Sequence, residues 1–551
     1  MTSWLPVALL AVPLLGAFLL LVAPSLLRPI LPAYGMVVSG VTLALAVALV
    51  ATFDHGQAGR PQATVDLPWV PGLDLRFHLG VDGISLPLVA LTALLTFLCF
   101  AYLGWGDARR PGQLLYPRPG GARPRALVFT LLVLEVGMIG TFLALDLLLF
   151  FVFFEIVLVP MYFLIAIWGG AERRGAAVKF ILYTLLGSVV MLLGLLLIWA
   201  QTGTLDIVAL GQAHGAGMSR AVQVLAFVAV GLGLAVKTPM WPLHTWLPDA
   251  HTQAPTVGSV LLAGVLLKMG TYGFARIAIP ILPEGAVAVA PWLGAFAVVG
   301  IIYGSLACLA QRDLKRMIAY SSVGHMGFVL LGFATLTTVG INGALFANVA
   351  HGLITGLLFF LAGAIKDRHH TADIPSLGGG LLARLPHLGA VLTFASIASL
   401  GLPGLAGFWG EMLALLGAFQ PADVLPRALF LTFMVIGGLG AVLTAAYFLV
   451  MLSRVTHGVP SVPLPVSAGA GPDDHPADAI VRPAGDLAAW ETPDERPVAP
   501  VGAVPEALDI QRYELVAWVP LIVLILLFGL WPQLLLSLTT PAVQTLLGAL
   551  S

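Results

Sequence analysis

The stretch that decides the fold runs from residue 231 to residue 268 and reads GLGLAVKTPMWPLHTWLPDAHTQAPTVGSVLLAGVLLK. It is apolar enough to lie in a membrane, yet it carries Lys237, Lys268 and four prolines. Within a bilayer, a proline that interrupts a helix is tolerated only inside a protein bundle or beside a water-filled cavity. A lysine at mid-span costs about 2.5–3.5 kcal/mol even on the lenient insertion scale, and such residues are usually functional. The stretch therefore predicts a broken transmembrane helix in a protein that moves ions.

Composition places the chain among the polytopic membrane proteins. Hydrophobic residues make up 59% of it and charged residues 10%, whereas about a quarter of the residues in soluble proteins are charged. The formal net charge of -1 excludes nucleic acid as a partner, because no basic surface is available to neutralise phosphates. Cys99 and Cys308 are the two cysteines and fall on different predicted helices. They provide neither a disulfide framework nor the ligands of an iron–sulfur cluster.

We expect an all-α fold with about fourteen transmembrane helices, because a span needs about 20 apolar residues. The candidate spans lie near residues 4–23, 31–53, 80–104, 125–145, 147–168, 177–200, 222–240, 256–281, 287–310, 315–335, 339–364, 387–418, 427–453 and 515–536. Prolines and glycines interrupt the seventh and the twelfth, which we expect to be discontinuous. No basic residue precedes the first span, which is unlike a cleaved signal peptide.

Basic residues are unevenly distributed among the short loops. Fifteen follow odd-numbered spans, and five, Arg276 among them, follow even-numbered spans. Cytoplasmic loops collect Lys and Arg. We therefore predict a multi-pass protein with both termini on the outer side of the lipid bilayer. We expect that membrane to be a bacterial plasma (inner) membrane.

The chain is expected to consist of five regions. They are residues 1–124 with the first three helices and a basic cytoplasmic loop, a first repeat half at 125–281, a second at 287–453, an acidic Pro- and Ala-rich insertion at 454–513, and a last helix in 514–551. The insertion has too few large apolar residues to fold alone, so we expect it to be disordered and cytoplasmic. The alternative is a docking segment for a neighbouring protein, anchored by Trp490.

Two segments of similar composition, residues 175–194 and 342–363, suggest an internal repeat. The two predicted helix breaks also fall at corresponding places, near Lys237 and Glu411. Paired interruptions in two halves of a chain indicate the ion site of a transporter built from inverted repeats. We therefore expect two inverted repeats.

Six ionisable side chains lie deep in six different predicted spans. They are Glu155, Lys237, Lys268, His325, His351 and Glu411. Lysine, unlike arginine, can release a proton when it is buried. Its alternative in a membrane is to extend to the interface, which fits poorly with the depth of Lys237 and Lys268. The set predicts a path for protons.

Glu155 is expected to pair with Lys237, two spans further along the chain. Such a pair can be purely structural. If it opens and closes, however, it changes how firmly the lysine holds its proton, and it then acts as a gate.

His325 and His351 suit a proton relay because histidine titrates near neutrality. Ser321 lies four residues before His325, and Asn348 and Thr355 lie three before and four after His351, so each polar group shares a helical face with a histidine. The alternative for each histidine is a satisfied group in the protein core.

Glu411 follows the Gly- and Pro-rich break in GLPGLAGFWGE and could end a file of water molecules. The alternative is a carboxylate that caps a re-entrant helix. Weaker candidates are Glu135, His244, Asp249 and His251 as supporting residues, and Asp146 as a helix cap. The chain contains no Gly-rich phosphate loop and no HExxH or CxxC spacing, so we expect no cofactor-binding residue and no metal site.

Four long motifs carry a resemblance to a known family. They are ALDLLLFFVFFEIVLVPMYFLI, VKTPMWPLHTWLPDAHTQAPTVGSVLLAGVLLKMGTYG, DLKRMIAYSSVGHMGF and GLPGLAGFWGE. With them the chain resembles the antiporter-like membrane subunits of respiratory complex I, the proton-pumping NADH:quinone oxidoreductase. A glutamate in the second broken helix is typical of the M branch of that family, which is chain 4 in mitochondria, whereas the L and N branches carry lysine. Because it has a glutamate at position 411, the chain resembles the M branch.

The resemblance implies a role for each deep ionisable residue. Glu155 and Lys237 would form a modulating pair, and Lys268 would transfer the proton. His325 and His351 would continue a hydrated axis that ends at Glu411.

The resemblance also implies that the chain is a translocase subunit of the respiratory chain, coupling proton translocation to electron transport. NADH, FMN, iron–sulfur clusters and quinone would lie in partner subunits, so this chain would hold no redox centre. L-like and N-like antiporter subunits would be its neighbours. The alternative is a subunit of a multisubunit cation/proton antiporter or of a membrane-bound hydrogenase.

Overall fold

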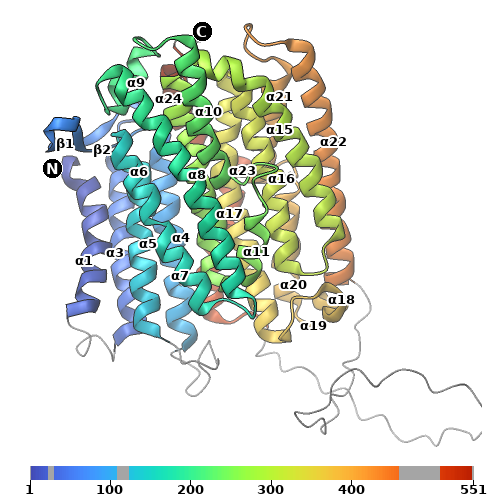
Figure 1. Ribbon diagram of the computed structural model, residues 1–551. Coiled ribbons are helices and arrows are strands. Elements are labelled where there is room, and N and C mark those ends of the chain that lie inside the picture. Colours follow the sequence, from blue (N-terminus) through green and yellow to red (C-terminus); the bar gives the residue numbers. More distant parts are fainter. Residues whose placement is uncertain (1, 23–29, 108–122, 458–508, 549–551) are drawn as a thin grey trace, which may run out of the picture.

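The computed structural model of the chain describes residues 2–22, 30–107, 123–457 and 509–548 (Figure 1). In these parts thirteen helices are long and apolar enough to cross a membrane. They coincide with thirteen of the expected spans. The expected twelfth span is instead two shorter apolar helices, Pro386–Ser399 and Ala406–Phe419, so the total of fourteen remains a prediction.

The helices follow one another as a bundle whose apolar side chains form one continuous core. The first repeat half and the helices before it comprise α1 (Leu5–Val22), α3 (Leu31–Thr52), α4 (Ser85–Asp107), α5 (Pro124–Leu143), α6 (Leu147–Ile156), α7 (Leu158–Trp168), α8 (Arg173–Thr202), α9 (Ile207–Ala213), α10 (Arg220–Lys237), α11 (Trp246–Gln253), α12 (Thr256–Leu261), α13 (Leu267–Gly273) and α14 (Ile279–Ile281). The remaining helices are α15 (Pro283–Ala310), α16 (Leu314–Ala334), α17 (Thr338–His369), α18 (Ile374–Leu377), α19 (Leu381–Arg384), α20 (Pro386–Ser399), α21 (Ala406–Phe419), α22 (Arg427–Leu452), α23 (Arg512–Leu530) and α24 (Gln533–Leu547).

Both expected helix breaks are present, but the two marked residues lie on different sides of them. Lys237 is the last residue of α10, before its break, whereas Glu411 lies in α21, after its break. The second break contains Gly401 and Gly404 at φ of 80° and 95°, a backbone conformation that favours glycine. The two helix breaks therefore occur where the sequence predicted them. Lys237 and Glu411, however, do not occupy equivalent positions relative to these breaks.

The span that holds Lys268 contains two π-helical turns, η5 (Leu262–Leu266) and η6 (Phe274–Ala278), one on each side of α13. A π turn inside an α-helix is rare and frequently marks a functional position. The span expected at 256–281 was predicted from its apolar length, which does not distinguish π turns from regular α-helix.

A β-hairpin adds to the all-helical expectation. β1 (Gln62–Val70) pairs with β2 (Leu75–Val81) in an antiparallel sheet, from Gln62 opposite Val81 to Val70 opposite Leu75. Apolar residues alternate along both strands, a pattern typical of a hairpin. The hairpin lies just before the third expected span, in a region for which no element was predicted.

The C-terminal region also differs from the single span expected at 515–536. α23 ends at Leu530, and α24 begins at Gln533 after Pro532. Buried Glu514 of α23 accepts two hydrogen bonds from Arg368 of α17, at 2.8 and 2.7 Å. The predicted insertion falls almost wholly on residues 458–508, outside the described residues.

Two opposite ends of the bundle can be distinguished (Figure 1). We call the end with β1, β2, α9 and α24 the hairpin face, and the end with α18 and α19 the basic face. The side of the membrane on which each face lies remains a prediction.

A backbone pattern occurs once at each face. Asp146 forms an antiparallel bridge with Asp206 at the hairpin face, and Asp313 forms one with Asp373 at the basic face. Each residue of the second pair follows its counterpart by 167 positions. Each of the four aspartates also caps a following helix. Equal spacing with opposite placement is what two inverted repeats produce.

Candidate proton-carrying site

Lys268 and His351 form the centre of the site. Lys268 lies on α13 with a fully buried side chain, and its Nζ is 2.6 Å from Nδ1 of His351 on α17. Lys268 also donates a hydrogen bond to the carbonyl oxygen of Ala263, which lies in the π turn η5. Either member of the Lys268–His351 contact can donate, depending on where the proton resides. The two predicted residues are thus in direct contact.

His325 and Glu411 form the second contact. Nδ1 of His325, on α16, is 3.0 Å from Oε1 of Glu411, and Nε2 is 3.1 Å from the hydroxyl oxygen of Ser399. Ser399 ends α20 just before the second break. The sequence analysis did not single it out, although a serine beside a predicted break is a readable signal.

A small cavity connects the two contacts. The rings of His325 and His351 are 5.6 Å apart between centroids, and Nε2 of His351 has no hydrogen-bond partner among the described residues. Both histidines, Thr355, Ser399 and Glu411 border a cavity of about 20 Å³. That volume is enough for about one water molecule. The site is therefore one continuous row of polar side chains, with room for a water molecule between its two contacts. In order, its members are Lys268, His351, His325 and Glu411.

Two of the polar neighbours predicted for the histidines have other partners. The hydroxyl of Thr271 donates to Oδ1 of Asn348 at 3.0 Å, one helical turn from Lys268. Ser321 donates to the carbonyl oxygen of Ile318 and lies beside Tyr447. Ser321 therefore shares the helix of His325 without binding it.

Glu155 and Lys237 are not in direct contact. Nζ of Lys237 lies 4.5 Å from the ring centroid of Phe154 on α6, and the charge of Glu155 acts on Lys237 over a longer distance. Successive side chains on a helix point about 100° apart, so α6 presents the Phe154 ring to the lysine and directs Glu155 elsewhere. The predicted ion pair is therefore absent from the described residues. The charge of Glu155 nevertheless acts on Lys237.

The two histidines near the first break are buried without ring hydrogen bonds among the described residues. His251 stacks on Phe359, with ring centroids 4.5 Å apart, and His244 packs edge-on against Tyr303 at 4.9 Å. Both histidines can serve as proton acceptors only when water reaches them.

The two predicted supporting carboxylates have very different surroundings. Asp249 lies at the basic face, 2.7 Å from Lys179 and 3.3 Å from Arg316. Glu135 on α5 is fully buried, and neither carboxylate oxygen has a partner among the described residues. An unpartnered polar group in a membrane span is costly. Asp249 is therefore a surface ion-pair member, whereas Glu135 remains a functional candidate.

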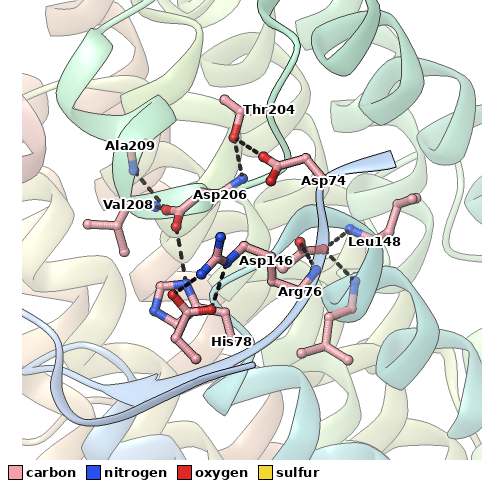
Figure 2. A network of polar contacts seen from close by, with 11 residues as sticks. Asp74, Arg76, His78, Asp146, Leu148, Thr204, Asp206, Val208 and Ala209 are labelled. Atoms are coloured by element: carbon pink, nitrogen blue, oxygen red, sulfur yellow. Dashed lines mark hydrogen bonds and ion pairs between the residues drawn. The ribbon is translucent and has the colours of Figure 1, made fainter. Parts of the chain in front are cut away.

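A polar network at the hairpin face was missed by the sequence analysis, apart from Asp146 as a cap (Figure 2). Asp146 accepts hydrogen bonds from the amides of Leu148 and Leu149, which caps α6, and a third from the amide of Arg76 on β2 at 3.1 Å. The prediction that Asp146 caps this helix is confirmed. The same carboxylate thereby fixes the hairpin to the bundle.

Asp206 is the second carboxylate of this network. It caps α9 and lies 3.2 Å from Nδ1 of His78 on β2 (Figure 2). Burial alone would raise the pKa of Asp206, but the neighbouring His78 and hydrogen bonds from the amides of Ala209 and Val208 hold that pKa below its usual value. Asp206 therefore remains charged at neutral pH and anchors β2 to the loop before α9.

The geometry can be compared with known proteins. The family described as NADH:quinone oxidoreductase/Mrp antiporter, transmembrane, matches residues 144–444, which is more than half of the chain. The chain belongs to this family. The matched range includes the whole chain of contacts from Lys268 to Glu411.

Relatives in this family include subunits of respiratory enzymes. The NADH-quinone oxidoreductase subunit M of Rhodobacter capsulatus is 44% identical over 428 residues, 76% of this chain and 78% of the relative. The NADH-ubiquinone oxidoreductase chain 4 of Arabidopsis thaliana is 40% identical over 451 residues, 82% of this chain and 86% of the relative.

Two solved structures have the same fold as this chain. A chain of respiratory complex I from Thermus thermophilus superposes with a TM-score of 0.78 at 28% identity, covering all of both chains. A chain of the Mrp complex from Dietzia gives the same TM-score at 24% identity, covering 100% of this chain and 98% of the other. The second similarity concerns the fold alone.

Proposed function

We propose that this chain is the M-type, proton-translocating membrane subunit of a NADH:quinone oxidoreductase in a bacterial plasma membrane. Support comes from the relatives named subunit M or chain 4 and from the glutamate at position 411. The redox steps would take place in partner subunits, where NADH, FMN, iron–sulfur clusters and quinone bind. L-like and N-like subunits would be its membrane neighbours.

The proton path runs laterally from Lys268 through His351 and His325 to Glu411. The observation that carries this proposal is the pair of direct contacts, 2.6 Å and 3.0 Å, joined by a cavity that admits about one water. Each of the four groups can both take up and release a proton. A proton on Lys268 can therefore reach Glu411 without crossing a purely apolar gap.

The first repeat half controls the loading of Lys268. Electron transfer in the partner subunits would alter the charge or hydration around Glu155 and Lys237. Lys237 lies next to Thr238, which packs against Gly270, two residues beyond Lys268. A change in the charge on Lys237 would act across this contact on Lys268. Protons would enter from the basic face, past His251, and leave from Glu411 on the outer side.

Purification through a tag on this chain tests the assignment. Co-purification of NADH-oxidising subunits, and NADH-driven acidification of proteoliposomes containing the complex, are the expected results. Isolation together with small membrane proteins alone would instead indicate a cation/proton antiporter. In that case a Na⁺ or K⁺ gradient, and not NADH, would drive proton movement.

A further inference from the structure

A buried ion pair lies on the Lys268 span but outside the proposed path. Nη1 of Arg276, in the π turn η6, is 2.6 Å from Oδ2 of Asp82, and the two side chains are 8% and 3% exposed. Counting of basic residues assigned Arg276 to a loop. The structure instead places it inside the span, about two helical turns beyond Lys268 on the way to the hairpin face.

Both carboxylate oxygens of Asp82 are engaged in hydrogen bonds. Its Oδ1 accepts hydrogen bonds from the amides of Ile84 and Ser85, both at 3.0 Å, and its Oδ2 is occupied by Arg276. Arginine does not release its proton in proteins. The pair therefore differs from His325–Glu411, in which both members can exchange a proton.

The pair also lies on the direct line from Lys268 to the hairpin face. Tyr272 and Arg276 follow Lys268 at intervals of four residues, which places them on one side of the span. The hydroxyl of Tyr272 donates to the carbonyl oxygen of Phe142 at 3.2 Å, and its ring packs edge-on against Phe142. Beyond Tyr272 the next polar side chain on this side is Arg276.

The position of Asp82 is fixed by the hairpin. Asp82 directly follows β2, and the same strand is held by His78 to Asp206 and by the Arg76 amide to Asp146 (Figure 2). The charge of Asp206 acts on Arg276 as well. The hairpin thus holds Asp82 in place over the end of the Lys268 span.

We propose that the Arg276–Asp82 pair is a proton barrier that closes the first repeat half toward the hairpin face. A fixed guanidinium charge excludes protons from a channel electrostatically, and arginine does not pass a proton on. The proton on Lys268 can then move only toward His351. The inference rests on the proposed function, because it assigns a direction to the same path.

Replacing the arginine by a residue that can exchange protons tests the barrier. Arg276→His keeps a partner for Asp82 and creates a histidine–carboxylate pair like His325–Glu411. The complex is reconstituted into liposomes that enclose a pH-sensitive dye, and a pH gradient is imposed without NADH. We expect the passive proton leak per complex to increase several-fold over the wild type.

The matched control is a second arginine–carboxylate pair among the described residues, with a buried carboxylate. Arg368 lies 2.7 Å from Glu514, at 13% and 1% exposure, and lies away from the Lys268 span near the basic face. Arg368→His is expected to keep the wild-type leak. Equal leaks in both histidine variants, or no increase in Arg276→His, would overturn the barrier.

A second variant keeps the test decisive if Arg276→His does not assemble. Arg276→Lys retains the positive charge but can release a proton, so a smaller increase in leak is expected, and an unchanged leak refutes the proposal. The assay uses an imposed gradient, so it reads the barrier even if NADH-driven pumping by the wild type fails. Failure of the proposed function and failure of the barrier are therefore separate results.

Discussion

The two predicted repeat halves hold their ionisable groups in different ways. In the second half, His325 is 3.0 Å from Glu411 and 3.1 Å from Ser399. In the first half, Lys237 faces the Phe154 ring, and no hydrogen bond or ion pair joins it to Glu155 or Lys268 within the described part of the chain. In the second half, the ionisable side chains are already within hydrogen-bonding distance of one another. The first half needs water or side-chain motion to be connected, and it is therefore the half in which proton flow can be regulated.

The largest effect is expected where the two halves meet, at Lys268. Lys268→Ala should reduce NADH-driven proton pumping by about two orders of magnitude, the usual size of effect when a proton-transferring group is lost. Lys268→Arg should fail to restore pumping, because arginine keeps the charge and cannot release the proton. Dye-reported acidification of proteoliposomes measures both. Restored pumping in the arginine variant would show that only the charge is needed.

A smaller loss is expected at the far end of the connected half. Glu411→Ala should reduce pumping about tenfold, at the low end of the range for proton-transfer groups, and Glu411→Lys should retain more of it, because lysine still exchanges protons beside His325. Pumping per NADH oxidised is the quantity to measure. Equal retention by the two variants would remove Glu411 from the path.

A smaller loss of activity is expected from a substitution in the first half, where no hydrogen bond joins Glu155 to Lys237. Glu155→Gln removes a charge that acts on Lys237 without breaking an ion pair, and residues that only modulate coupling typically contribute about 0.5–2 kcal/mol. We expect coupled quinone reductase activity to fall severalfold, with the complex intact. Pumping and activity equal to the wild type would contradict a gating role.

The smallest effect concerns stability in acid. The pKa of Asp206 is lowered in the folded chain, so its charge stabilises the fold above the usual carboxyl pKa of about 3.9, and this contribution is lost as the pH falls through the lowered value. Asp206→Asn keeps a capping side chain and removes the titration. Thermal unfolding in detergent should therefore depend less on pH below about 4 in the variant. Identical acid dependence in both proteins would argue against this link.

Much of the site could be predicted from the sequence because charge in an apolar span is conspicuous. Lys268, His325, His351 and Glu411 were each identified in this way, and the structure joins them. The pairing of Glu155 with Lys237 could not be predicted, because the direction in which each side chain points depends on how the break and α6 are placed. A shift of one residue on a helix turns a side chain by about 100°.

Other features were readable but were overlooked. TLDI at 204–207 and TADI at 371–374 repeat at the spacing of the two backbone bridges, and apolar alternation marks β1 and β2. Arg276 was counted with the loops although it falls inside the expected span 256–281, and its partner, Asp82, lies 194 residues earlier. An ion pair of such separation becomes visible only when the chain is folded.

The ion pair between Arg368 and Glu514 helps to attach the last span, α23, to the bundle. α23 is held by this ion pair and by a hydrogen bond from the Trp409 indole to the carbonyl oxygen of Gly529 at 2.8 Å. Because both contacts are made by residues outside 458–508, we expect α23 to keep its place in the bundle when that link is altered. An epitope spliced into that link should leave the helix docked, and antibody access from one side of sealed vesicles would then establish which way the whole chain is inserted.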